Sequence, residues 1–535
     1  MNRKGIYLMI LMTLAGSAVV RSQDVERPRP AEWNDLVEGG RFMDRFLPMT
    51  NMQSQSKDAA WGAPGVRNRY IDNGIEVDNL SIWGGNILRN DDGKYHLFVC
   101  GWNESASKGH MSWWDSTVFH ATGDSLAGPY RLHGTVGRGH NPEAFRLDDG
   151  RTVVYVIDGY YISDKVHDDI WVYDKFSFDA RGRKIIDGLS NLTFARRKDG
   201  SRLMVCRGGG VWVSRNGLSV YRQISDGSIY PDVDGDFEDP VLWRDSVQYN
   251  LIVNDWRGRI AFYMRSPDGI EWITEPGEAY VPGIARHGDG TVEEWYKFER
   301  PKVFQDEHGR AVQMNFAVID TLKYCDLPYD HHSSKNITIP LNKGLLLEIL
   351  NKGRIGTSVK GIDVRIRAEE GFDPNSDINV GSLRFGSYSE VNFGRGGKAV
   401  RTRKDGQDLI VTFDGRNSGV DEREFAPKLI GRKKDGSMVF GYAKMPGYRY
   451  DRPVLSANII AGDGADVDTV AEIENFGLSR SDTVMAAVSL NGKVIREITV
   501  PALQPYEKMT FTLPSVGNDD LYSISFKNTC NYEKN

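Results

Sequence analysis

The sequence has few cysteines and no large excess of charge of either sign. Its four cysteines, Cys100, Cys206, Cys325 and Cys530, are too few and too scattered for a disulfide framework in 535 residues. Cys100 and Cys206 end apolar runs, so we expect buried thiols rather than a bridge. The formal net charge is -6 and no basic stripe is present, which argues against a nucleic-acid partner.

The N-terminal apolar run is too short to span a membrane. Ile6–Leu14 follows two basic residues and precedes several small ones, which is the pattern of a Sec signal peptide. We therefore predict a signal peptide over residues 1–22, with cleavage after Ala18 or Ser22. No cysteine follows the run, so a lipid anchor is not indicated. The expected product is exported, periplasmic or secreted, with no membrane insertion; its oligomeric state is left open.

Helical periodicity is nearly absent, and short strand-turn-strand units recur in its place. The second halves of five such units are Asp92–Cys100, Asp149–Ile157, Asp199–Cys206, Arg244–Val253 and Glu307–Phe316. Their turns recur roughly every 50 residues, a period typical of propeller blades rather than solenoid repeats. We predict an all-β chain with a five-bladed β-propeller over residues 23–340, including an N-terminal extension. An irregular pair of β-sandwiches is the alternative.

The repeat is lost after Gly344. Residues 341–450 remain strand-rich without the blade pattern, and we predict a β-sandwich there. Residues 451–535 alternate apolar and polar positions around an Asn491-Gly492 turn, which favours an immunoglobulin-like sandwich. Both modules are expected to pack against the propeller or space it.

Acidic residues stand where the innermost strands of the predicted blades begin. Glu238 and Asp239 precede Pro240, and Glu299 opens the fifth unit as "FERP". In a propeller, such strand starts project into one central funnel, and Asp78 near the start of the first unit is expected to join them. Because strand neighbours point to opposite sides, we predict that Asp239 faces the funnel and Glu238 faces away.

A cluster of carboxylates beside indole rings suits glycoside cleavage. One group must be protonated so that it can donate its proton to the leaving oxygen. Another must be ionised to activate water or attack the sugar. Like charges held close together push the pKa values of such groups apart. The structural alternative is that Asp239 and Glu299 cap strands or pair with Arg300 and Lys302.

The five units, the "EDP" and "ERP" strand starts and the outer-strand segment "SPDGIEW" resemble the five-bladed glycoside hydrolases of families 43, 62 and 117. The layout is most similar to family 117, the exo-acting α-neoagarooligosaccharide hydrolases, over roughly Trp61–Pro340. The resemblance implies Asp78 as the base, Asp239 as the auxiliary acid and Glu299 as the third acid. Family 117 uses a histidine as proton donor, for which His287 is the nearest candidate.

Other residues are candidates for substrate contact. Trp83 is expected to stack on a sugar face or to lie in the core. His140 and Asn141 would face the funnel or shape a turn, and Asn191 stands where other blades use acids. Arg207, which precedes three glycines, would bind a substrate carboxylate or sulfate. No cofactor is expected to be required, although members of these families often hold a divalent ion such as calcium in the channel; metal ligands cannot be assigned from the sequence.

The favoured function is an exported, exo-acting glycoside hydrolase that cleaves a terminal sugar from a poly- or oligosaccharide. Family analogy suggests inversion of configuration and an algal galactan or plant glycan as substrate. A non-catalytic glycan-binding propeller is the alternative from another class. A polysaccharide lyase using His140 and Arg207 is a third, less favoured reading.

Overall fold

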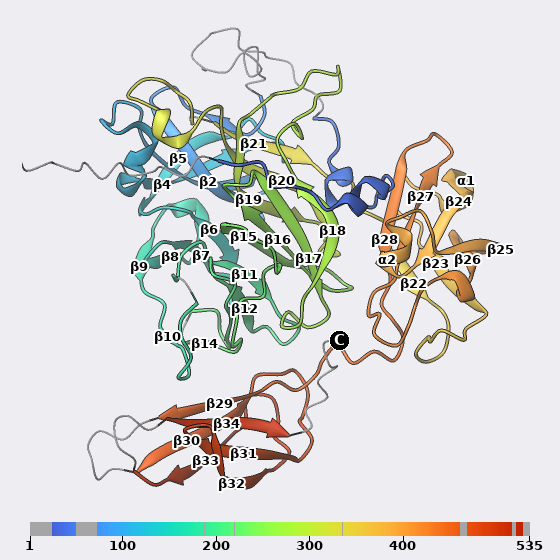
Figure 1. Ribbon diagram of the computed structural model, residues 1–535. Helices are drawn as coiled ribbons and strands as arrows, with labels where there is room; N and C mark the ends of the chain where they lie inside the picture. The colour runs from blue at the N-terminus through green and yellow to red at the C-terminus, as the bar shows by residue number, and fades with distance from the viewer. Residues whose placement is uncertain are drawn as a thin grey trace, which may run out of the picture.

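The computed structural model describes residues 24–49, 72–186, 188–218, 220–333, 335–460, 468–515 and 521–527. The predicted signal peptide, Trp61 and Cys530 lie outside these residues. The described chain is almost entirely β (Figure 1), as predicted, and its two α-helices, α1 (Pro374–Asp377) and α2 (Tyr388–Val391), have four residues each. No helix of this part is long and apolar enough to span a bilayer. Cys100 and Cys206 are buried free thiols, as expected.

Five sheets, antiparallel except for one short pair, follow one another along the first two thirds of the chain. The first contains β2 (Leu80–Arg89), β3 (Tyr95–Asn103), β4 (Thr117–Gly123) and β5 (Arg131–Arg138). The second contains β6 (Glu143–Arg146), β7 (Thr152–Val156), β8 (Gly159–Ser163) and β9 (Val172–Asp174). The third contains β11 (Thr193–Arg196), β12 (Arg202–Val205), β13 (Val211–Ser214) and β14 (Tyr221–Gln223), with β10 (Phe178–Asp179) pairing parallel to β14.

The fourth sheet contains β15 (Phe237–Arg244), β16 (Tyr249–Asp255), β17 (Ile260–Ser266) and β18 (Ile273–Tyr280). The fifth contains β19 (Lys297–Gln305), β20 (Ala311–Ile319), β21 (Lys335–Pro340) and β1 (Ile75–Glu76). Because β1 is followed directly by β2, its pairing with β21 ties the beginning of the five-sheet segment to its end.

The five sheets form a ring. Apolar clusters join each sheet to the next: Val154 and Phe98 belong to one such cluster, Met204 and Tyr155 to another. The fifth sheet contributes Phe304 to the cluster of the first sheet, which closes the ring. The first strands of the sheets lie innermost, and β2 contacts both β6 and β19.

The two C-terminal modules differ in construction. In the middle module, seven strands are hydrogen-bonded into one sheet that encloses a single apolar core: β22 (Leu347–Ile349), β23 (Gly361–Ile366), β24 (Ile378–Gly386), β25 (Gly397–Asp405), β26 (Asp408–Asp414), β27 (Lys428–Lys433) and β28 (Met438–Tyr442). The last module has two three-stranded sheets around one core: β29 (Leu455–Ile460), β30 (Thr469–Asn475) and β33 (Lys508–Leu513), then β31 (Val484–Leu490), β32 (Lys493–Val500) and β34 (Tyr522–Lys527).

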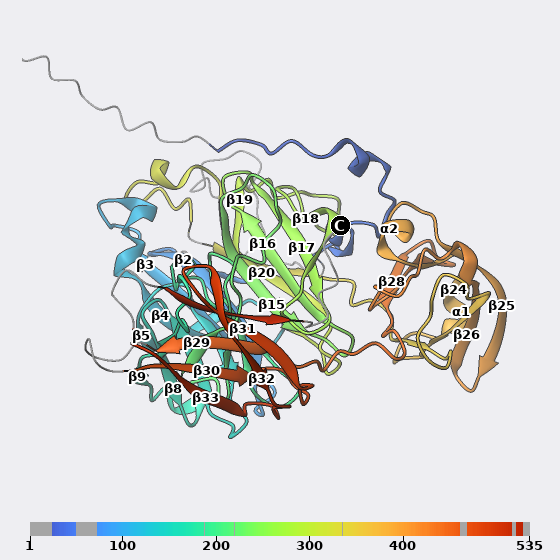
Figure 2. The same cartoon turned by 60° about the horizontal axis from the view of Figure 1, so that its bottom comes forward.

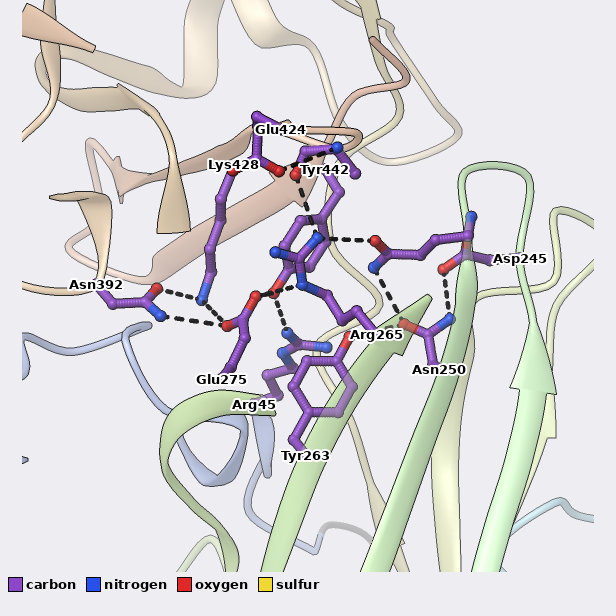
Figure 3. A network of polar contacts seen from close by, with 12 residues as sticks. Arg45, Asp245, Asn250, Tyr263, Arg265, Glu275, Asn392, Glu424, Lys428 and Tyr442 are labelled. Atoms are coloured by element: carbon purple, nitrogen blue, oxygen red, sulfur yellow. Dashed lines mark hydrogen bonds and ion pairs between the residues drawn. The ribbon is translucent and has the colours of Figure 1, made fainter. Parts of the chain in front are cut away.

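Both modules lie beside the ring (Figure 2), and buried polar contacts connect them to it. Arg181 of the ring donates to Glu472 (2.8 Å) and to the carbonyl oxygen of Ser456 (2.9 Å) in the last module. At the middle module, Glu275 of β18 lies between Arg265 of the ring (2.5 Å) and Lys428 of β27 (3.3 Å) (Figure 3). Burial alone would raise the pKa of Glu275, but the surrounding cations outweigh it and lower this pKa to about 2.

Candidate active site

One backbone feature recurs where each inner strand begins. A residue with left-handed backbone occupies the same position in all five sheets: Gly84 (φ 62°), Asn141 (54°), Asn191 (52°), Asp239 (54°) and Arg300 (52°). Pairing with the next strand shifts register directly afterwards in the first, fourth and fifth sheets. These residues and the ones that follow them line a central cavity of about 10 Å³. That volume is at the lower limit for one water molecule, so the centre of the ring is filled by side chains.

A line of polar contacts crosses this centre. Asn141 Nδ2 donates to Asn191 Oδ1 (2.9 Å), and Asn191 Nδ2 donates to Asp239 Oδ1 (3.2 Å). From the opposite side, the backbone N–H of Arg300 donates to Asp239 Oδ2 (3.1 Å) and its guanidinium pairs with the same carboxylate. Asp239 is therefore ion-paired with Arg300, the partner that the structural alternative names for it.

The centre does not fit the calcium ion that the family resemblance implies. The guanidinium of Arg300 already supplies the positive charge that faces Asp239. A second cation there would face Arg300 in a cavity too small for an ion with its waters. The amide nitrogens of Asn141 and Asn191 donate to Asn191 Oδ1 and Asp239 Oδ1, and Asn141 Oδ1 is the one amide oxygen of the two that is buried without a hydrogen-bond partner.

The residues one position earlier in the chain form a second set, with one member at each of the five inner strand starts. They are Trp83, His140, Ser190, Glu238 and Glu299. Two of the five are acidic, and they come from the neighbouring fourth and fifth sheets. The cations of Arg300 and Lys323 act on both Glu238 and Glu299, so the two carboxylates share one electrostatic environment.

Glu238 is the more accessible of the two acids in this set. Its side chain is 13% exposed and pairs with Arg207, whose Nη2 lies 2.5 Å from Glu238 Oε1. Burial, and next the charge of Asp239, raise the pKa of Glu238 above its ordinary value, although Arg300, Lys323 and Arg207 oppose them. Glu238 is therefore the carboxyl group that keeps its proton more readily.

Glu299 has the opposite character. Its side chain is 1% exposed and pairs with Lys323 of the short helix η6 (Lys323–Cys325). Burial would raise the pKa of Glu299, but Lys323 and Lys297 outweigh it and lower this pKa below its ordinary value. Lys323 Nζ also lies 5.4 Å from the ring centroid of Trp83 and 5.4 Å from that of Trp256. Glu299 is thus an ionised carboxylate covered by a lysine between two indoles.

The relation between Glu238 and Asp239 differs from the prediction. Strand alternation was expected to aim only Asp239 at the site. Asp239 adopts a left-handed backbone and is followed by a register shift, so regular alternation does not hold here. Asp239 is sealed at the centre with a side chain that is 0% exposed, and Glu238 is the partly exposed acid.

Asp78 and His287 lie apart from this arrangement in their described contacts. Asp78 is exposed on the turn between β1 and β2. His287 is buried between β18 and β19, where its Nε2 lies 3.0 Å from Glu293 Oε1 and its backbone pairs with Met49. The structure brings Asp239 and Glu299 to the centre of the ring through Arg300, and it shows no contact that links His287 to them among the residues described.

The predicted sugar-binding residues are mostly buried. Trp83 is 1% exposed and packs edge-on against His110, so its faces are not open to a sugar. His140 Nδ1 forms a hydrogen bond with Ser116 Oγ (2.9 Å), and the His140 ring packs on Trp113. Burial lowers the pKa of His140 well below its ordinary value, and nearby Arg300 lowers it further, so the imidazole is neutral. Of this group, Arg207 is the accessible residue, and its side chain pairs with Glu238.

Two residues of the site were not predicted from the sequence. Lys323 lies in a loop between β20 and β21, and Trp256 follows β16. Neither belongs to the strand starts in which the repeat is visible. A sequence signal for Lys323 would have required knowing that this loop folds back over Glu299.

No known protein-family profile matches the chain, and no curated protein matches it by sequence. Among solved structures, the chain is similar to a family 117 glycoside hydrolase from Zobellia galactanivorans, with 10% identity and a TM-score of 0.37, over 50% of this chain and 85% of that one. It is similar to an α-L-arabinofuranosidase from Lactobacillus brevis, with 8% identity and a TM-score of 0.34, over 49% and 90%. A third is a family 43 arabinoxylan arabinofuranohydrolase from Bacillus subtilis, with 11% identity and a TM-score of 0.33, over 88% and 98%. These proteins include members of families 117 and 43, which the sequence resembles.

Proposed function

We propose that this protein is an exported glycoside hydrolase that removes a terminal sugar from a poly- or oligosaccharide, with inversion. The ring of five sheets is proposed to be a five-bladed propeller, and the last module an immunoglobulin-like sandwich. Export rests on the predicted signal peptide, residues 1–22. An algal galactan or a plant glycan is the proposed substrate class, on the family resemblance.

The observation that carries the proposal is the pair Glu238 and Glu299. They occupy equivalent positions in neighbouring sheets, and their pKa values are shifted in opposite directions, upward by burial for Glu238 and downward by Lys323 against burial for Glu299. One protonated and one ionised carboxyl group are what acid–base cleavage of a glycosidic bond requires.

The roles follow from this pair. Glu238 donates its proton to the leaving oxygen of the scissile bond, which replaces His287 as the proposed donor. Glu299 remains ionised beside Lys323 and Lys297 and activates the attacking water. Asp239 acts through Glu238, because its negative charge raises the pKa of that donor. Arg207 orients Glu238 and is placed to contact an anionic substituent of the substrate.

The test is a screen of the full-length protein against a glycan panel, with reducing-sugar release and absorbance at 235 nm measured in parallel. Release of a single terminal sugar without a rise at 235 nm supports exo-hydrolysis. A rise at 235 nm would identify a lyase and overturn the proposal. Anomeric NMR of the first product then distinguishes inversion from retention.

A non-catalytic glycan-binding protein is the second candidate. The observation that favours it is the sealing of the carboxylates: Asp239 is locked to Arg300, and Glu299 is covered by Lys323. Binding of an oligosaccharide by calorimetry, with no product after prolonged incubation, would support this candidate over the hydrolase.

A further inference from the structure

Four of the ten histidines of the chain lie together on the first two sheets, away from the acids of the ring. With two aspartates they form two groups, within each of which the possible ligand atoms are all within 4.8 Å of one another: Asp92, His96 and His167, then His120, His133 and Asp169. Imidazole and carboxylate groups at this spacing are typical ligands of divalent transition metals.

The contacts of the first group show where its protons lie. Asn90 Nδ2 donates to His167 Nε2 (2.9 Å), and Arg146 holds the amide in this orientation by donating to Asn90 Oδ1. A neutral His167 therefore carries its proton on Nδ1, which faces Asp92 Oδ2 at 3.5 Å. His96 Nε2 lies 3.3 Å from Asp92 Oδ1. Asp92 therefore faces a proton on His167 and not a lone pair, so the first group is less suited to a metal ion.

A hydrogen bond between two histidines joins the groups. His96 Nδ1 lies 2.7 Å from His120 Nε2. The hydrogen bond engages Nε2 of His120, so Nδ1 is the nitrogen of this ring that faces Asp169.

His120 Nδ1 faces a carboxylate. It lies 2.7 Å from Asp169 Oδ1, and His133 Nε2 lies 3.4 Å from Asp169 Oδ2. A proton on His120 Nδ1 makes the shorter contact a hydrogen bond, and a bound metal ion would displace that proton. His120, His133 and Asp169 thus converge on one position where a divalent ion can take three ligands.

We propose that His120 Nδ1, His133 Nε2 and Asp169 bind a divalent transition-metal ion, zinc first among them. Ligand atoms bound at about 2.0–2.1 Å in a tetrahedron stand about 3.3 Å apart, close to the spacing of His133 and Asp169. The side chains of His133 and Asp169 are 50% and 22% exposed, which gives the ion access and a water in the fourth position. His96 orients the ring of His120 through its other nitrogen, and Asp92 contacts His96 in turn, as second partners of metal-bound histidines do.

The backbone holds the aspartate in place for this role. Asp169 has a left-handed backbone (φ 46°) directly after the short helix η5 (Val166–Asp168). Its carboxylate packs on Gly134 of β5, where a Cβ would lie 2.2 Å from Asp169 Oδ2. The ion would therefore connect β4 and β5 of the first sheet to a loop of the second sheet.

The test is a zinc titration of the full-length, chelator-treated protein against a chromophoric competitor. We expect one zinc per chain and a higher melting temperature with zinc. His133→Ala and Asp169→Asn should each weaken binding by at least about 100-fold, and Asp92→Asn by about 10–100-fold. His308→Ala, on an exposed turn, is the matched control and should bind as the wild type does.

Cobalt absorption bands of a tetrahedral site provide a readout that does not depend on stability, and circular dichroism checks that each variant folds. Two results would overturn the proposal. One is zinc binding that His133→Ala leaves unchanged. The other is binding abolished by His167→Ala and not by His133→Ala, which would assign the ion to the first group.

Discussion

The guanidinium of Arg300 pairs with the carboxylate of Asp239 at the centre of the ring. Both residues have left-handed backbone, and they come from equivalent positions of adjacent sheets. Asp239, which the family resemblance assigns to catalysis, is thus held at the centre by Arg300. Its neighbour in the chain, Glu238, is the carboxyl group nearest to solvent. Asp239 therefore stabilises the ring and tunes Glu238 through its charge.

Asp239→Asn should destabilise the protein. Asparagine tolerates the left-handed backbone, so the main loss is the partner of the buried Arg300. We expect about 3–5 kcal/mol less free energy of unfolding, measured by urea denaturation. The control is Asp148→Asn, which removes an exposed partner of Arg196 and should cost no more than about 1 kcal/mol. Equal losses in the two variants would contradict this role for Asp239.

The two glycines of the first sheet should respond differently to alanine. At Gly84 (φ 62°), a Cβ would come no closer than 3.8 Å to Arg300, so only the backbone conformation is penalised, by about 1–2 kcal/mol. At Gly85 (φ 108°), a Cβ would lie 2.3 Å from the carbonyl oxygen of Phe98. We expect Gly85→Ala to lose more than about 3 kcal/mol in thermal unfolding. A smaller loss for Gly85→Ala than for Gly84→Ala would contradict the close approach of Gly85 to the backbone of Phe98.

Glu275 should make the stability of the protein depend on acidic pH. Its ordinary pKa is 4.5 and, in the fold, Lys428 and Arg265 lower it to about 2 against the effect of burial. Because the folded pKa is the lower one, the stabilisation is complete above about pH 4.5 and is lost as the pH falls towards 2. Glu275→Gln should remove this acid-side dependence and cost about 3–5 kcal/mol at pH 7, since Arg265 and Lys428 stay buried.

Urea denaturation between pH 2.5 and pH 7 measures this effect. Glu307→Gln, which changes an acid whose side chain is 81% exposed, should leave the pH profile of stability unchanged. An identical profile for Glu275→Gln and the wild type would contradict the assignment.

Arg207 should set the alkaline limb of the activity profile. If Glu238 is the proton donor, activity falls as the pH rises through its raised pKa, because the donor ionises. Arg207 opposes that rise in pKa by favouring the charged form of Glu238. Arg207→Gln should therefore move the alkaline limb to higher pH, measured as kcat/KM against pH. A shift to lower pH would contradict the role of Glu238.

The sequence predicts the recurrence of the sheets better than it predicts the site. The prolines at 142, 240 and 301 mark three of the equivalent strand starts, and the turn residues mark the second strands. The left-handed residue before each proline has no periodic signature, so strand alternation did not predict that Asp239 is fully buried while Glu238 stays partly exposed. Lys323 reaches Glu299 from a loop about 20 residues further on, a contact that depends on tertiary packing.

The histidine cluster could not be predicted from the sequence either, because it also depends on tertiary packing. His96, His120 and His133 lie on three successive strands, and His167 lies in η5, between β8 and β9 of the next sheet. Each is an isolated residue in its own segment, without the short ligand spacing that identifies many zinc sites.

The most direct test of the account compares product release from the cleaved glycan by the wild type, Glu238→Gln, Glu299→Gln and the surface control Glu307→Gln. The account predicts that Glu238→Gln and Glu299→Gln each lose about 10²–10⁴-fold in kcat with their fold retained, whereas Glu307→Gln keeps the wild-type rate. Wild-type kcat in either Glu238→Gln or Glu299→Gln would contradict the assignment of this pair as proton donor and base.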